Sequence, residues 1–298
     1  MSTLSTNIPL TKLKEEVKQN ALAEEITHFY DEATEDYSFW SKDLNMHFGY
    51  FDLKRTNLFR RDTMLNELNR RVMIAMDLPA QNSTVIDLGC GMGGTMRYLL
   101  NHNKKLKALG VTLSGFQVQE GNKLLKGKNG VILQENFENT SLPSNTANGV
   151  VAMESLCHSG HSYNSLKEAH RLLKEGGKFV MTDAFLKKSP DSLCLGSSYS
   201  YKQLCKGWSL DGLGQIERVK KDLEDLGFRK VEVKDISFRV APSVFHVPFA
   251  ITGFLLKKLF NRKKVKPQRW NNLKASFYAL LSGLHMKDFG YYIITATK

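Results

Sequence analysis

Residues 84–95 combine an acidic side chain with closely spaced glycines, which is a pattern suited to holding a small polar molecule. The apolar run that begins at Thr84 carries Asp87 near its end, and Gly89, Gly91 and Gly93 follow. Glycine adopts positive φ and lets the backbone approach a ligand with no Cβ in the way. Residues 96–100 continue as a helix, so the segment predicts a nucleoside-binding turn. A purely structural turn is the simpler alternative, and the density of glycines argues against it.

Two cofactor classes fit this turn. The spacing from Gly89 to Gly94 matches the G-x-G-x-x-G pattern of nicotinamide dinucleotide loops, and it also suits S-adenosylmethionine (SAM). A dinucleotide brings a pyrophosphate to the helix N-terminus, whereas SAM brings a sulfonium and an amino group. Asp87 precedes the first glycine by two residues and would attract those cations. The segment therefore favours SAM over a dinucleotide.

Residues 87–94 resemble the first motif of class I SAM-dependent methyltransferases. Residues 110–117 carry Thr112-Leu113-Ser114 and Gln117 where most nucleoside-binding sheets have an acid, and they resemble the tocopherol, sterol and cyclopropane-fatty-acid type. The resemblance implies SAM as cofactor and S-adenosylhomocysteine (SAH) as product. It implies these cofactor-binding residues: Asp87, Gly89, Gly91, Gly93, Thr112, Leu113, Gln117, Asn136, Phe137 and Met153.

Asn136 and Phe137 follow the third predicted strand, where many relatives carry Gly-Asp-Ala. The Asn136 carbonyl oxygen can accept a hydrogen bond from the adenine amino group, although without a charge. Phe137 is placed to pack on the adenine face, and an ordinary core phenylalanine is the alternative.

Residues 153–158, Met-Glu-Ser-Leu-Cys-His, resemble a phrase of the tocopherol-methyltransferase group. Methyl transfer needs alignment and the removal of a proton, and we predict Glu154 and His158 as the catalytic residues. Glu154 could equally bind a substrate hydroxyl or stabilise a carbocation. We predict that substrate contacts come from Tyr30, Trp40, His47, Tyr50 and His161, and the histidines could instead be structural. Cyclopropane synthases, which carry similar motifs, use an N-terminal cysteine. No cysteine precedes Cys90 in this sequence, so cyclopropane synthesis is disfavoured.

Alternating strand and helix patterns predict an α/β fold with a doubly wound sheet. Strands are expected at 84–88, 106–113, 130–134, 149–153, 178–183, 231–238 and 291–297, with helices at 114–125, 162–173 and 215–226. The resemblance implies a Rossmann-like seven-stranded methyltransferase sheet with an antiparallel last strand. We divide the chain into an N-terminal helical lid (1–80), a SAM-binding core (81–184), a loop-like lid insertion (185–214), more core (215–238), a helical and basic lid insertion (239–288) and a last strand (289–298).

The net charge of +12 in 298 residues suggests an anionic partner. In residues 247–270 an apolar helix runs into a basic segment, which would suit a helix on an anionic membrane surface, capture of a diphosphate, or simple packing on the domain. A nucleic-acid acceptor is disfavoured, because the fourth predicted strand is not followed by the Asn/Asp-Pro-Pro-Tyr/Phe phrase of base amino-methyltransferases.

The four cysteines have no metal-type spacing, so we expect reduced thiols, no metal and a cytoplasmic protein. Residues 1–20 show no secretory signal, and no stretch of about 18 apolar residues is present. The sequence thus predicts a SAM-dependent methyltransferase of a small hydrophobic, isoprenoid- or lipid-like acceptor, with carbon as one candidate target. The alternatives are N- or O-methylation of another small molecule, and SAM binding without catalysis.

Overall fold

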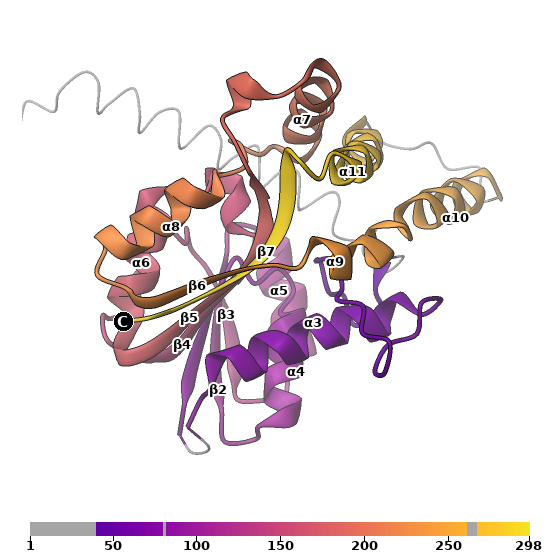
Figure 1. Cartoon of the computed structure of the whole chain (residues 1–298). Helices are drawn as coiled ribbons and strands as arrows, with labels where there is room; N and C mark the ends of the chain where they lie inside the picture. The colour runs from indigo at the N-terminus through magenta and orange to yellow at the C-terminus, as the bar shows by residue number, and fades with distance from the viewer. Residues whose placement is uncertain (1–39, 80–81, 261–266) are drawn as a thin grey trace, which may run out of the picture.

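The computed structural model of the chain describes residues 40–79, 82–260 and 267–298 (Figure 1). Its sheet has seven strands in the order β3-β2-β1-β4-β5-β7-β6. The strands are β1 (Thr84–Leu88), β2 (Lys107–Thr112), β3 (Gly130–Gln134), β4 (Ala147–Met153), β5 (Leu173–Leu186), β6 (Arg229–Asp235) and β7 (Phe289–Thr297). β1 to β5 pair in parallel, and β7 runs antiparallel to both β5 and β6. The predicted seven-stranded sheet with an antiparallel last strand is confirmed.

Helices cover both faces of this sheet (Figure 1). One face carries α3 (Arg61–Met76), α4 (Gly94–His102) and α5 (Gly115–Leu124), and the other carries α6 (Tyr163–Leu172) and α8 (Ile216–Asp225). Fully buried Leu68 and Val72 of α3 belong to the core on the first face, and Leu166 and Val219 belong to the core on the second. Burial of apolar side chains on both faces explains why the central strands read as nearly continuous hydrophobic runs.

The turn after β1 packs against the turn after β4, at the carboxyl edge where doubly wound sheets bind their ligands. Gly89 adopts a φ of +79°, and a Cβ added there would lie 2.4 Å from the Ser155 Cβ. The Ser155 hydroxyl also donates to the Leu88 carbonyl at 2.5 Å. Only glycine at this position allows the two turns to approach so closely.

The remaining helices gather beyond this edge. They are η2 (Leu156–Ser159), η3 (Pro190–Ser192), α7 (Leu195–Trp208), α9 (Ser237–Val244), α10 (Val247–Phe260) and α11 (Pro267–Leu284). Figure 1 shows α7 and α11 side by side. The Trp208 indole donates to the Asn272 Oδ1 at 2.9 Å, and a Cβ at Gly207 would lie 2.6 Å from the Ala275 Cβ. None of the helices in the described part of the chain combines the length and the apolar character that a membrane span requires.

Two expected elements differ from the structure. The expectation of a loop-like segment at 185–214 is wrong, because α7 occupies half of it. Its Gly- and Ser-containing sequence has a low helix propensity, and close packing on α11 compensates. The strand expected at 231–238 ends at Asp235, whose Oδ1 accepts from both the backbone N–H and the hydroxyl of Ser237. These hydrogen bonds end the strand at Asp235 and fix the turn that leads into α9.

Candidate functional site

Two cavities meet at the carboxyl edge of the sheet. The smaller has a volume of about 180 Å³ and the larger about 470 Å³. Met46, His47, Glu154 and His158 line both of them. The two cavities are therefore adjacent, and we call these four shared side chains the junction.

The smaller cavity collects nearly all of the predicted cofactor residues. Asp87, Gly89, Gly91, Thr112, Leu113, Gln117, Asn136, Phe137 and Met153 line it. Gly93 does not line it and is instead the N-cap of α4, with a φ of +71°. Gly91 faces the junction, since a Cβ added there would lie 2.9 Å from the Met46 sulfur.

Asp87 is a buried acid in the lining of the smaller cavity. It lies near the end of β1, between β2 and β4, and only 2% of its surface is exposed. Burial alone raises its pKa to about 7. A cation at hydrogen-bond distance would lower that pKa and favour the carboxylate. The glycine turn and this buried acid fit the amino and sulfonium groups of SAM.

The predicted cofactor-binding residues that follow β2 and β3 are held by hydrogen bonds of their own. The Thr112 hydroxyl donates to the Gln117 Oε1 at 2.6 Å, and Ser114 caps α5 by accepting from the Gln117 backbone N–H. The Asn136 side-chain oxygen accepts from the Glu138 N–H at 2.9 Å, so the loop itself orients this amide. These bonds fix the polar atoms that line the far end of the smaller cavity.

Glu154 is the acidic residue of the junction, and its pKa lies well above the ordinary value of a glutamate. Its Oε1 accepts hydrogen bonds from the Phe48 backbone N–H and from the Tyr291 hydroxyl, both at 2.6 Å. Its backbone takes a φ of +48°, which is rare for a residue with a side chain. Burial raises its pKa to about 8 in spite of both hydrogen bonds. A carboxyl group with this pKa is suited to accept a proton near neutral pH.

The two junction histidines are weaker bases than Glu154. Burial lowers the pKa of His158 to about 4 and that of His47 to about 4. The His47 Nδ1 lies 2.7 Å from the Phe48 carbonyl, which can only accept, so Nδ1 carries the proton. Both imidazoles are therefore neutral at pH 7, and they are suited to orient a substrate. Of the predicted catalytic pair, Glu154 has the pKa that is closer to neutral pH, so it is the better candidate for removing a proton.

The larger cavity is mainly apolar. Its walls come from the segment around Trp40 and from α7, α9, α10 and α11, and include Phe48, Leu204, Trp208, Val240, Leu273 and Leu280. The acids in its walls are Glu154, which is half-buried, and Asp183, which is buried. Among the described residues that line it there is no lysine or arginine.

The structure separates the predicted substrate residues. Trp40 and His47 line the larger cavity, whereas Tyr50 and His161 line neither cavity. The Arg71 guanidinium lies over the Tyr50 ring, 4.5 Å from its centroid. The His161 Nδ1 accepts from the Gly214 N–H at 3.0 Å, and its Nε2 lies 3.1 Å from the Asp183 Oδ2. Tyr30 lies outside the described residues.

Three residues at or beside the junction were not predicted. Met46 has no sequence signal apart from its place in the Trp40–Phe51 segment, and Asp183 ends a predicted strand without a motif. Tyr291 comes from β7, 137 residues after Glu154, and is brought to it only by the antiparallel placement of the last strand.

Comparison with known proteins agrees with this geometry. Residues 86–181 match a methyltransferase domain family. The chain is 27% identical over 264 residues to cycloartenol-C-24-methyltransferase of Arabidopsis thaliana, covering 81% of this chain and 72% of that protein. It is 28% identical over 228 residues to the SAM-dependent Diels-Alderase iccD of Talaromyces variabilis, covering 72% of this chain and 76% of that protein.

Solved structures support the fold. The geranyl diphosphate C-methyltransferase of Streptomyces coelicolor superposes with a TM-score of 0.69 at 16% identity, covering 93% of this chain and 97% of that one. Together with the glycine turn and the buried acid, these matches identify residues 86–181 as a SAM-dependent methyltransferase domain, in a chain that resembles sterol and tocopherol methyltransferases.

Proposed function

We propose that the chain methylates an uncharged, isoprenoid- or lipid-like acceptor that occupies the larger cavity. The supporting observation is the composition of that cavity: about 470 Å³ with mainly apolar walls, two carboxyl groups and, among the described residues, no lysine or arginine. Of the residues that the structure describes there, a diphosphate would meet two acids and no lysine or arginine, which costs free energy. A neutral acceptor with a long apolar body avoids this penalty.

The junction gives this proposal a mechanism. Bound SAM supplies an electrophilic methyl group on a good leaving group. His47 and His158, both neutral, orient the polar end of the acceptor, and the apolar walls exclude water. Glu154 then accepts the proton that the acceptor loses, whether from a hydroxyl or from the carbon beside a cation formed by methylation of a double bond. Tyr291 holds the Glu154 carboxylate in place through its 2.6 Å hydrogen bond.

Some of the related proteins support an isoprenoid acceptor. The plant relative is named for a sterol and the Streptomyces neighbour for geranyl diphosphate, both isoprenoids. The Diels-Alderase relative raises a second function, in which SAM binds and its methyl group stays in place. Glu154 is the feature that favours transfer, since a base is needed when a methyl group replaces a proton.

A panel of acceptors tests the acceptor class. We expect labelled methyl from SAM to enter neutral sterols, prenylated quinols or prenylated phenols, and to enter prenyl diphosphates, sarcosine-like amines and RNA at least about tenfold more slowly, since burying an unpaired charge costs several kcal/mol. Preferential labelling of a diphosphate or an amine would overturn the choice of a neutral acceptor.

We also propose that α10 contacts a membrane surface and receives the acceptor from it. Phe249 is 76% exposed on α10, and Phe238 and Phe245, which line the larger cavity, are also exposed. Aromatic side chains at a cavity rim and a basic segment nearby in the sequence fit an interfacial helix. We expect the protein to float with anionic vesicles and Phe249→Asp to float less. Equal flotation of the two would exclude α10 from the contact.

A further inference from the structure

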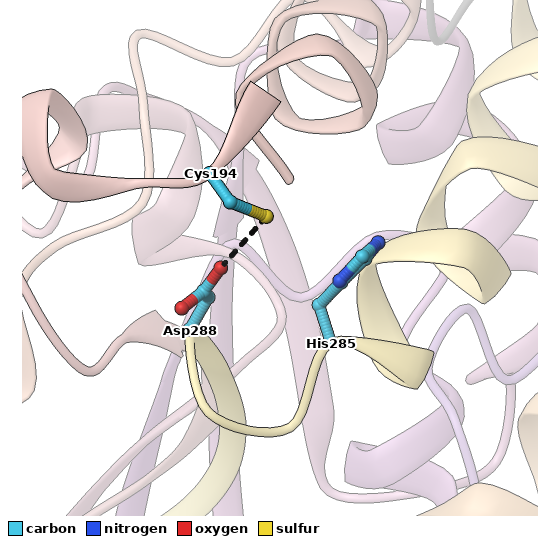
Figure 2. A group of neighbouring side chains, drawn as sticks. All are labelled: Cys194, His285 and Asp288. Carbon is cyan, nitrogen blue, oxygen red and sulfur yellow. Dashed lines mark hydrogen bonds between the residues drawn. The ribbon is translucent and has the colours of Figure 1, made fainter. Parts of the chain in front are cut away.

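A cluster of metal-ligating side chains lies where α7, α11 and β7 meet. Cys194, His285 and Asp288 each offer one donor atom, and these atoms lie within 4.8 Å of one another. Figure 2 shows the Cys194 and Asp288 side chains directed toward each other, with His285 beside them at the end of α11. The Cys194 sulfur lies 3.9 Å from the Asp288 Oδ2. Cys194 and Asp288 are not among the residues that line the smaller cavity or the larger cavity.

The donor set selects a class of ion. One thiolate, one imidazole and one carboxylate are ligands for Zn²⁺ and similar borderline ions, whereas Mg²⁺ and Ca²⁺ prefer oxygen ligands. In a tetrahedral zinc site the donor atoms lie about 3.5 Å apart. Cys194 is exposed and His285 is half-buried, so their side chains have room to rotate inward by the remaining ångström.

The surroundings of the cluster suit a bound cation. Asp288 is only 4% exposed, and its Oδ1 pairs with the Lys188 ammonium at 2.6 Å, which leaves Oδ2 turned toward Cys194. A second partner on a ligating carboxylate is usual in metal sites, because it orients the ligand. The Ser197 hydroxyl lies 3.2 Å from the Cys194 sulfur and orients it beside Asp288.

We propose that Cys194, His285 and Asp288 bind a Zn²⁺-class ion, with water as the fourth ligand. The sulfur–metal bond replaces the thiol S–H bond, and the proton leaves to solvent. The ion ties the start of α7 to the connection between α11 and β7. Leu204 and Trp208 of α7 and Leu280 of α11 line the larger cavity. Because the bound ion holds these two helices together, it stabilises the wall of that cavity. This inference does not depend on the identity of the acceptor.

Titration of the tag-free, full-length protein with Co²⁺ tests the site. We expect one equivalent to bind with a thiolate-to-cobalt charge-transfer band, and Zn²⁺ to displace it. Cys194→Ser should abolish the band, and His285→Ala should weaken binding about 100-fold, since loss even of an outer partner costs 10–100-fold. Cys205→Ser is the matched control, since Cys205 lies on α7 outside the cluster, and it should bind Co²⁺ as the wild type does.

Thermal melting supplies a readout that is independent of the spectrum. Zn²⁺ should raise the melting temperature of the wild type and of Cys205→Ser, and should leave that of Cys194→Ser unchanged. A wild type without the charge-transfer band would overturn the proposal, as would a band that persists in Cys194→Ser.

Discussion

Replacing Glu154 by glutamine will lower kcat about 100-fold or more while SAM affinity stays the same. General-base catalysis contributes roughly 10²–10⁴-fold, and Glu154 is the group at the junction whose pKa, about 8, suits proton removal near neutral pH. Glutamine keeps the shape and can still accept from the Phe48 N–H and the Tyr291 hydroxyl, so the SAM cavity should be undisturbed. Turnover assays and SAM titration separate the two effects.

The pH dependence of turnover adds a second test of Glu154. The base must be ionised to accept a proton, so kcat/KM of the wild type should rise with pH, reach half of its plateau near pH 8 and level off above that pH. A bound sulfonium would move this limb to lower pH, because a nearby cation favours the carboxylate. Glu154→Gln should lack the limb. Glu175→Gln, at a side chain that is 80% exposed and distant from both cavities, serves as the control. Normal turnover of Glu154→Gln would remove Glu154 from the mechanism.

Replacing Asp87 by alanine or asparagine will weaken SAM binding about 100-fold. A hydrogen bond to a charged partner is worth up to about 3 kcal/mol, which corresponds to roughly that factor. Because burial holds the pKa of Asp87 near 7 in the free protein, a bound cation must draw a proton off it. Wild-type binding should therefore strengthen from pH 6 to pH 8, and the variants should lose this dependence. Calorimetric titration at both pH values measures it.

Asp225→Ala provides the control for Asp87. Asp225 pairs with the exposed Lys221 on α8 and is not among the residues that line either cavity. The Asp225→Ala variant should therefore bind SAM as tightly as the wild type. Asp87→Asn should fold at least as stably as the wild type, since it removes a buried ionisable group without changing shape. An unchanged SAM titration for both Asp87 variants would show that the acid does not face the cofactor.

The core of the fold and the cofactor cavity could be predicted because their signals are local. Gly89 and Gly91 are adjacent in sequence to Asp87, and the structure places all three in one wall. Glu154 and His158 follow one strand, so their shared position at the junction also follows from short-range spacing.

The acceptor side was harder to predict because its contacts are long-range. Tyr291 reaches Glu154 from the other end of the chain, and α7 is a helix because it packs on α11. Tyr50 and His161 have side chain types that suit a substrate site. In the structure, however, the Tyr50 ring packs against Arg71 and His161 pairs with Asp183. The division of the chain into core and lid segments, and its cytoplasmic placement, stay predictions.

In the proposed mechanism, the methyl group of SAM passes from the smaller cavity, across the junction, to an acceptor in the larger cavity. The most direct test of this transfer is to quantify SAH and methylated acceptor together in one reaction with labelled SAM. We predict one SAH for each labelled acceptor, and the loss of both products in Asp87→Ala and Glu154→Gln. Conversion of an acceptor without formation of SAH, or tight SAM binding with no transfer to any acceptor, would contradict the account.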